Sequence, residues 1–155
     1  MIEPIRHLLG RWIPSCLKVV DPAARNSFWG THTNDLNPNT RAQSHLEAAE
    51  FLSRLREAGQ RFPAALLDLP YSPRQVQECY QNVGRAVTQR DVQSLWREAK
   101  DGIDSVLMPN AIVICCGWNS SGMGKGRKYK LIETLLVTHG GDHNDTIVTV
   151  ERKLA

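Results

Sequence analysis

The sequence lacks the features that mark membrane-spanning, secreted and metal-centred proteins. No apolar run among its 155 residues is long enough to cross a bilayer or to serve as a signal peptide. The cysteines show no metal-ligand spacing, so we interpret them as reduced residues of an intracellular, cytoplasmic protein. The four cysteines are Cys16, Cys79, Cys115 and Cys116. This length predicts one domain over residues 1–155.

A strong excess of one charge sign is also absent. Nineteen Lys and Arg residues against sixteen Asp and Glu residues give a formal net charge of +3. Such a mild excess is compatible with an anionic partner but does not identify one. The function must therefore be inferred from local motifs.

One stretch in the middle of the chain joins a short apolar run to a complete helix start. Residues 62–67 have the length and composition of one buried strand. Ser72 can cap a helix, Pro73 suits its first position, and Gln75 can complete a capping box. Residues 68–71 (Asp-Leu-Pro-Tyr) thus follow the carboxyl end of a strand, which is where open α/β sheets bind ligands.

This stretch resembles the Asp-Pro-Pro-Tyr motif of amino-methyltransferases that use S-adenosylmethionine, above all the adenine-specific DNA methylases, with Leu69 replacing the first proline. The resemblance implies that the Asp68 carboxylate and the Leu69 carbonyl accept hydrogen bonds from the amine that is methylated. Pro70 would stiffen the turn, and Tyr71 would stack on a base that has left the duplex. The alternative is an ordinary strand-to-helix turn with a surface aspartate.

An earlier stretch matches the same family in part. Residues 17–20 predict a short strand leading into 21–27 (Asp-Pro-Ala-Ala-Arg-Asn-Ser), where the family has Asp-Pro-Phe-x-Gly-x-Gly. The family's glycines let the backbone approach the methionine part of the cofactor, but Arg25 and Ser27 stand in their places. The residues of this run expected to contact the cofactor are Asp21, Pro22 and Ala23.

Residues 30–33 predict a second strand, which leads into Asp35 and Leu36. Nucleotide-binding α/β folds place a carboxylate here to accept from both ribose hydroxyls, so Asp35 is our ribose candidate and Leu36 its neighbour in the site. An ordinary turn is the alternative, since Asn, Asp and Pro are turn formers. Only the nine residues 21–29 separate the two strands, which leaves room for a turn at most between them.

Residues 40–43 form another capping box and predict a helix that runs from Thr40 to Gly59. Within it, Glu47 falls where the resembled family has an acid that contacts the cofactor's adenine. A solvated helix acid is the alternative interpretation. Residues 88–107 predict a long core helix with no catalytic part, and 111–116 predict a central strand.

Residues 117–130 combine glycines, basic residues and aromatic rings. The glycines predict a mobile loop, four cations make it positive, and the rings offer stacking faces for exposed bases. A solvated loop is the alternative. The nucleic-acid-binding candidates are Trp118, Asn119, Lys125, Arg127 and Lys128.

The end of the chain predicts a β-hairpin. Residues 131–138 and 146–154 are β-rich, and 139–145 connect them. Two histidines and two aspartates in the connection invite a metal site, but Gly-Gly and Asn-Asp are turn chemistry, so we predict no metal. Methyltransferase sheets of the resembled family end in such a hairpin, with its tip at the ligand edge.

The resemblance thus predicts an α/β fold: a shortened, Rossmann-like class I methyltransferase sheet that ends in an antiparallel hairpin. It implies methyl transfer from S-adenosylmethionine to the exocyclic amine of adenine in DNA, in a short form like those of phage and prophage. Loops, a second copy or a partner subunit would then supply target recognition. No cysteine follows a proline, which disfavours a cytosine ring-carbon methylase.

Two alternatives remain open from the sequence. One is an amino-methyltransferase of RNA, or of a protein glutamine, although the glutamine branch usually has Asn where Asp68 stands. The other is a non-catalytic relic that binds nucleic acid or a partner subunit, a reading that rests on Arg25, Ser27 and Leu69.

Overall fold

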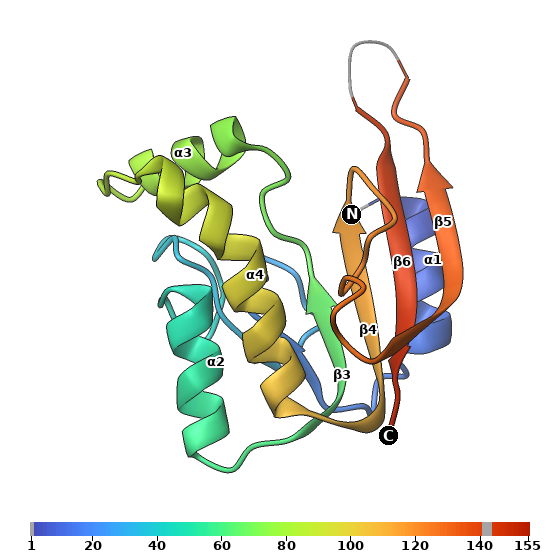
Figure 1. The fold of residues 1–155 in the computed structure, drawn as a ribbon. Coiled ribbons are helices and arrows are strands. Elements are labelled where there is room, and N and C mark those ends of the chain that lie inside the picture. Colours follow the sequence, from blue (N-terminus) through green and yellow to red (C-terminus); the bar gives the residue numbers. More distant parts are fainter. Residues whose placement is uncertain (1, 141–143) are drawn as a thin grey trace.

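Six strands form one mixed sheet in the order β2-β1-β3-β4-β6-β5 in a computed structural model that describes residues 2–140 and 144–155 (Figure 1). The strands are β1 Val19–Asp21, β2 His32–Thr33, β3 Phe62–Leu67, β4 Leu107–Gly117, β5 Tyr129–Val137 and β6 Thr146–Lys153. The helices are α1 Glu3–Trp12, α2 Ala48–Glu57, α3 Pro73–Gln81 and α4 Gln89–Val106. The predicted α/β class and the closing antiparallel hairpin are confirmed.

The sheet reverses its direction of growth between β1 and β3. Strands β2, β1, β3 and β4 are parallel, and β6 runs antiparallel to both of its neighbours, β4 and β5. The chain moves outward from β1 to β2 and then returns to the other side of β1 with β3. In open α/β sheets a ligand binds at such a switch point, outside the carboxyl ends of the strands.

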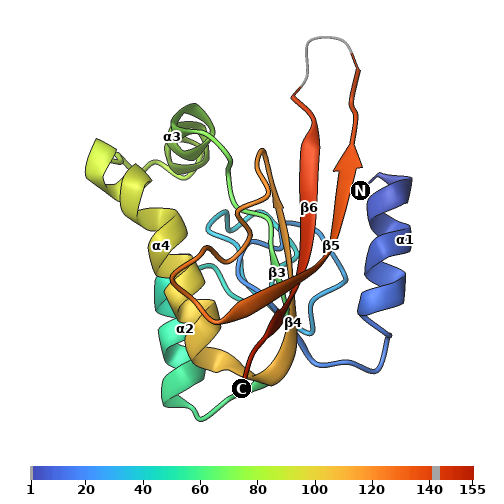
Figure 2. The same ribbon diagram turned by 45° about the vertical axis from the view of Figure 1, so that its right-hand side comes forward.

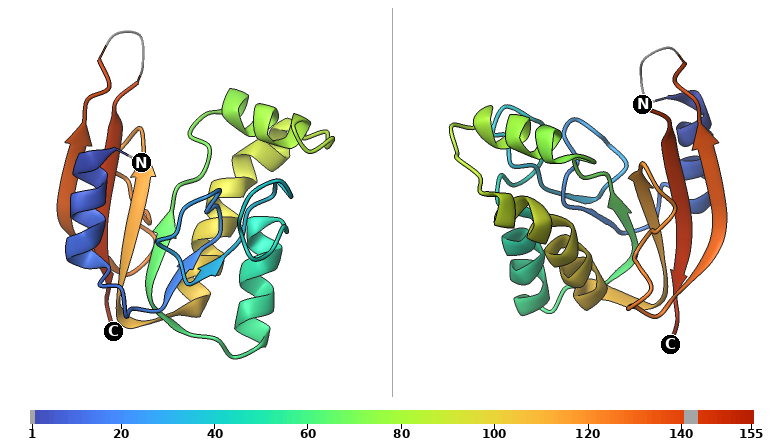
Figure 3. Two further views of the ribbon diagram at one scale, coloured as in Figure 1. Left: turned by 180° about the vertical axis from the view of Figure 1, so that it is seen from behind. Right: turned by 45° about the horizontal axis from the view of Figure 1, so that its top comes forward.

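Helices cover both faces of the sheet, and Figure 2 shows the sheet between α1 on one side and α2 with α4 on the other. Buried residues of α2 and α4, among them Leu52 and Ile103, pack with Phe62 and Val113 in one apolar cluster. On the opposite face, α1 packs over the side of the sheet formed by β5 and β6 (Figure 3). Burial of apolar area on both faces supplies the main stabilisation of this arrangement.

The strand-to-helix stretch in the middle of the chain folds as predicted. β3 covers residues 62–67, and α3 begins directly after a complete capping box. The Ser72 hydroxyl accepts from the Gln75 backbone N–H at 3.2 Å, and the Gln75 side chain accepts from the Ser72 N–H at 3.3 Å. These reciprocal bonds satisfy two helix N–H groups that would otherwise lack partners.

The helix predicted from Thr40 is wrong in its first part, because α2 begins only at Ala48. The cause is Asn34, a fully buried side chain whose amide binds the loop that follows β2. Its Oδ1 accepts from the Leu46 N–H at 2.9 Å, and its Nδ2 donates to the carbonyls of Leu46 and Pro22 at 2.9 and 3.0 Å. These bonds hold the loop beside β2, where it cannot wind into a helix.

Between β1 and β2 the chain forms turns, as the short spacing predicted. None of the helices in the described residues has the length and apolar character that crossing a bilayer requires.

Candidate functional site

The carboxyl ends of β1, β2 and β3 surround a cavity of about 470 Å³, which we call the larger cavity. Small-molecule sites typically measure roughly 300–1,000 Å³, so the volume suits a ligand of that size. Nine predicted site residues lie in its wall. They are Pro22, Ala23, Asp35, Leu36, Glu47, Asp68, Leu69, Pro70 and Tyr71. Four separate segments of sequence therefore meet at the switch point of the sheet.

A second cavity, of about 340 Å³, lies at the carboxyl end of β4, and we call it the smaller cavity. Three aromatic residues line it: Tyr71, Trp96 and Trp118. The Lys100 ammonium also reaches this wall and lies 5.1 Å from the centre of the Trp96 ring. Tyr71 lines both cavities, so the two spaces adjoin at this side chain.

The Tyr71 side chain is fixed by two contacts. Its hydroxyl donates to Oδ1 of Asp68 at 2.5 Å. Its ring meets the Trp118 ring edge-on, with centroids 5.8 Å apart and an interplanar angle of 63°. The other oxygen of the Asp68 carboxylate accepts no hydrogen bond from any residue that the structure describes, so it remains available to a ligand.

The Asp68 side chain is exposed and opens into the larger cavity. Desolvation by the surrounding protein raises its pKa above the ordinary value, while the hydrogen bond from Tyr71 and the charge of Arg25 act in the opposite direction. Burial of the phenol and the neighbouring Asp68 charge likewise raise the pKa of Tyr71, so its hydroxyl remains a donor. The pair thus offers one acceptor oxygen at the boundary between the cavities.

Two neighbouring residues hold the backbone of this turn. The Leu69 side chain is buried in the core cluster, which explains how leucine fits where the resembled motif has proline. The Trp96 indole N–H donates to the Pro70 carbonyl at 2.9 Å. Sequence reasoning assigned Trp96 to the core alone, because apolar spacing shows the face of a helix but not the partner of an indole N–H.

Asp21 is the one predicted cofactor residue outside the wall of the larger cavity. Its side chain is only 3% exposed, and Oδ1 accepts from the Ala23 N–H at 3.2 Å. Burial, and then the nearby charges of Asp68 and Asp35, raise the pKa of Asp21 to about 7. The Asp21 side chain therefore bonds within the turn that follows β1, and its expected contact with the cofactor stays a prediction.

Asp35 lies in the cavity wall with both oxygens aimed at backbone groups. Oδ2 accepts from the Arg25 N–H at 3.0 Å, and Oδ1 accepts from the Asn37 N–H at 2.9 Å. A carboxylate has about four lone-pair sites, so each oxygen keeps capacity for a second donor. Asp35 is thus oriented by the loops on either side and can still bind hydroxyl groups.

Glu47, which precedes α2, is held by one side chain of α3 and by one that follows α3. Oε2 accepts from the Tyr80 hydroxyl at 2.6 Å, and Oε1 accepts from the Arg85 guanidinium at 2.8 Å. Arg85 offsets its charge within the protein. The predicted contact with adenine stays a prediction, since Glu47 lines the cavity but already has two partners.

The loop between β4 and β5, for which the glycines predicted mobility, is buried and hydrogen-bonded at its middle. The Met123 side chain is fully buried, and its N–H donates to the buried Glu151 carboxylate at 2.6 Å. Gly122, with φ +48°, lies so close that a Cβ there would meet Oε2 of Glu151 at 2.0 Å. A larger residue here would have to displace the Glu151 carboxylate and adopt a strained positive φ, both of which glycine avoids.

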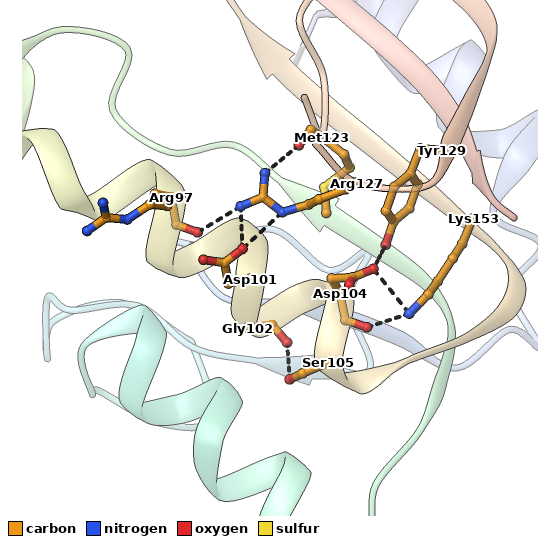
Figure 4. A network of polar contacts seen from close by, with 9 residues as sticks. All are labelled: Arg97, Asp101, Gly102, Asp104, Ser105, Met123, Arg127, Tyr129 and Lys153. Carbon is orange, nitrogen blue, oxygen red and sulfur yellow. Dashed lines mark hydrogen bonds and ion pairs between the residues drawn. The ribbon is translucent and has the colours of Figure 1, made fainter. Parts of the chain in front are cut away.

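Arg127 joins the loop to α4, as Figure 4 shows. Its guanidinium binds Asp101, the Met123 carbonyl at 2.8 Å and the Arg97 carbonyl at 3.3 Å. Its three nitrogens thus donate to α4 and to the loop, and the nucleic-acid role expected of Arg127 stays a prediction. Tyr129 similarly donates to Asp104 at 2.7 Å.

The other nucleic-acid candidates lie at the surface. Lys125 and Lys128 are exposed, and their ammonium groups form no ion pair with any side chain that the structure describes. Trp118 is 40% exposed beside the smaller cavity, which Asn119 also lines. The oxygen of the Asn119 side chain accepts from the Ser121 N–H at 3.0 Å and so shapes the turn.

The side chains that could bind a metal ion are scattered over the described residues. No group of three or more His, Cys, Asp or Glu among them is placed to hold a metal ion. Of the connection between β5 and β6, residues 141–143 lie outside the described part of the chain. His139 and Asp145 bind each other there, through the His139 N–H and Oδ1 of Asp145 at 3.2 Å.

Solved structures share this fold over almost the whole chain. TrmN from Thermus thermophilus matches with a TM-score of 0.64 and 14% identity, over 96% of this chain and 48% of TrmN. The N-methyltransferase NodS from Bradyrhizobium japonicum WM9 matches with a TM-score of 0.61 and 10% identity, over 98% of this chain and 96% of NodS. SMU.776, a putative methyltransferase complexed with SAH, matches with a TM-score of 0.58 and 12% identity, over 98% of this chain and 50% of SMU.776.

These likenesses, at such low identity, establish a shared fold. The chain has the α/β fold found in methyltransferase structures, and it spans about half the length of TrmN and of SMU.776. No protein-family model matches the sequence, and no curated protein is significantly similar to it.

Proposed function

We propose that this protein is a methyltransferase that uses S-adenosylmethionine and methylates an exocyclic amine of a nucleic acid, adenine in DNA. The observation that carries the proposal is the meeting of Asp35 and Asp68 around one cavity at the switch point, with an aromatic cavity adjoining it at Tyr71. The likeness to methyltransferase structures, one of them complexed with SAH, supports the same assignment.

The larger cavity fits the cofactor by its donor set. Asp35 offers acceptors to the ribose hydroxyls, and Pro22, Ala23, Leu36 and Glu47 line the space around it. When bound, S-adenosylmethionine supplies an electrophilic methyl group on a sulfonium. Asp68 binds Tyr71, the side chain at which the two cavities adjoin, and an acceptor amine and a methyl donor would meet beside this pair.

The smaller cavity suits a flat base. Its rings can stack on a base face, and stacking contributes about 1–3 kcal/mol per base in single-strand recognition. The free oxygen of Asp68 would accept from the amine while positive charge develops on it, and the Leu69 carbonyl would accept the second N–H. A base reaches such a site only after leaving its stack.

Nucleic-acid binding is proposed for the face that bears Trp118, Asn119, Lys125 and Lys128. Arg127 is left out, because its guanidinium is already bonded within the protein. An RNA amine would use the same groups, so RNA is the alternative substrate. A second copy or a partner subunit would complete target recognition, since the site offers few base-reading groups of its own.

Titration calorimetry with S-adenosylmethionine tests the proposal against a non-catalytic relic. We expect saturable one-to-one binding heat, followed by methyl transfer to adenine-containing DNA or to RNA of the same sequence. Absence of binding heat would favour the relic.

A first prediction concerns Asp35. Asp35→Ala should weaken S-adenosylmethionine binding by about 1.5–3 kcal/mol, the range for charge-assisted hydrogen bonds. Because the substitution also frees two backbone N–H groups, the 2′-deoxy analogue of S-adenosylhomocysteine serves as a control ligand. Its affinity should fall less, since one of the ribose hydroxyls is missing. Equal losses for both ligands would mean that Asp35 acts only through the loop.

A second prediction concerns the exposed lysines. Changing Lys125 and Lys128 together to glutamine should weaken binding to every nucleic-acid sequence and lower the salt slope by up to about two phosphate contacts. Fluorescence anisotropy across a salt series measures the slope. Arg56→Gln, which removes an exposed cation from the last turn of α2, is the control. A slope equal to that of the unaltered protein would identify the loop as solvated surface.

A further inference from the structure

Arg25 stands at the first glycine position of the resembled cofactor loop and has a backbone conformation that favours glycine. Its φ is +50°, in the left-handed region that residues other than glycine seldom adopt. The strain is held by two bonds: the Arg25 N–H donates to Asp35 at 3.0 Å, and the Ser27 N–H donates to the Ala24 carbonyl at 2.8 Å. The loop thus tolerates a side chain where the family has none.

The Arg25 side chain lines the larger cavity. Within the residues that the structure describes, its guanidinium forms no hydrogen bond or ion pair. Asp68 and Cys79 line the same cavity, and the charge of Arg25 lowers the pKa of each against the effect of burial. The cation therefore faces the space between β1 and α3.

The charges around the cavity define what a ligand must carry. Asp35 and Asp68 are acceptors, and Arg85 already offsets Glu47. Arg25 is the remaining cation of the wall without a partner among the described residues, and its five N–H donors match a carboxylate in two-point geometry. A ligand with hydroxyls and a carboxylate would satisfy Asp35 and Arg25 together, while Asp68 serves the substrate amine as proposed above.

We infer that the Arg25 guanidinium binds the carboxylate of the amino-acid part of S-adenosylmethionine, in place of the backbone approach that the family's glycines allow. The inference rests on the proposed function and adds a residue to it. A side-chain clamp of this kind would explain how the loop departs from the glycine pattern without losing the cofactor.

Two ligands separate the carboxylate from the rest of the cofactor. S-adenosylhomocysteine contains the amino-acid part, whereas 5′-methylthioadenosine has the same adenosine and sulfur without it. Titration calorimetry should show that Arg25→Met lowers the affinity for S-adenosylhomocysteine at least about tenfold. The affinity for 5′-methylthioadenosine should stay within about twofold, because no carboxylate is present to lose its partner.

Three further variants control for charge and backbone. Arg25→Lys should recover part of the affinity, and Arg25→Gly should lose the carboxylate contact although glycine suits the positive φ. Arg41→Met removes an exposed arginine outside the larger cavity and should leave both affinities unchanged. Thermal unfolding checks that each variant is folded.

The outcomes distinguish this inference from the proposed function. If Arg25→Met binds S-adenosylhomocysteine as the unaltered protein does, or loses both ligands equally, the clamp is refuted and the cofactor site stands. If the unaltered protein binds neither ligand, the proposed function fails, and the clamp falls with it.

Discussion

Replacing Asp68 with alanine should lower the rate of methyl transfer about a hundredfold or more, because one preorganised acceptor at the developing charge is lost. The side chain opens into the larger cavity, so its removal leaves no hole in the core. Transfer of a labelled methyl group from S-adenosylmethionine to adenine-containing DNA measures the rate, and thermal unfolding confirms the fold. The affinity for S-adenosylhomocysteine should change far less than the rate.

Two matched variants make this test specific. Asp68→Asn keeps one neutral acceptor oxygen and should lie between the alanine variant and the unaltered protein. Leu69→Pro restores the family's residue, keeps the main-chain carbonyl and should change the rate only modestly, although it removes a buried side chain. Full activity of Asp68→Ala would exclude the proposed mechanism. A gain of activity in Leu69→Pro from an inert protein would identify a relic.

The second large effect is a dependence of stability on pH that Asp21 dominates. Its pKa is raised from 3.8 to about 7 by burial. A group with a raised pKa in the folded state stabilises the fold fully below its unfolded pKa, and this stabilisation is lost as pH rises through the folded pKa. We therefore expect the free energy of unfolding to fall by about 2 kcal/mol between pH 5 and pH 8.

Asp21→Asn should remove most of this dependence, because an amide does not titrate and can still accept from the Ala23 N–H. Urea unfolding of the variant and of the unaltered protein at pH 5 and pH 8 gives the comparison. Glu98→Gln, which removes an exposed carboxylate of α4, is the control and should keep the original dependence. The same dependence in Asp21→Asn would show that other groups cause it.

Local signals made the central part of the fold predictable. The capping box of Ser72 and Gln75 and the apolar run before it act within a few residues, so β3, α3 and the position of Asp68 followed from the sequence. The resemblance then placed Asp35 on the same cavity, as the structure does. Parallel strands bring these ends to one edge whatever their separation along the chain.

The features that could not be predicted from the sequence depend on contacts between residues far apart in the chain. Asn34 displaces the start of α2 through bonds to Leu46 and Pro22, and no local pattern marks a buried amide of this kind. Arg127 looked like a free cation because Asp101, its partner, lies 26 residues away. Helical spacing also could not show that the Trp96 indole reaches the Pro70 carbonyl.

The fixed middle of the loop between β4 and β5 has a consequence for the thermodynamics of nucleic-acid binding. Buried Met123 and bonded Arg127 already hold the segment on which Lys125 lies, and Lys128 follows directly. Ordering a free backbone costs roughly 1–2 kcal/mol per residue in conformational entropy. Because most of this ordering occurs on folding, binding through the loop should carry a small entropic penalty and little change in its hydrogen-exchange protection.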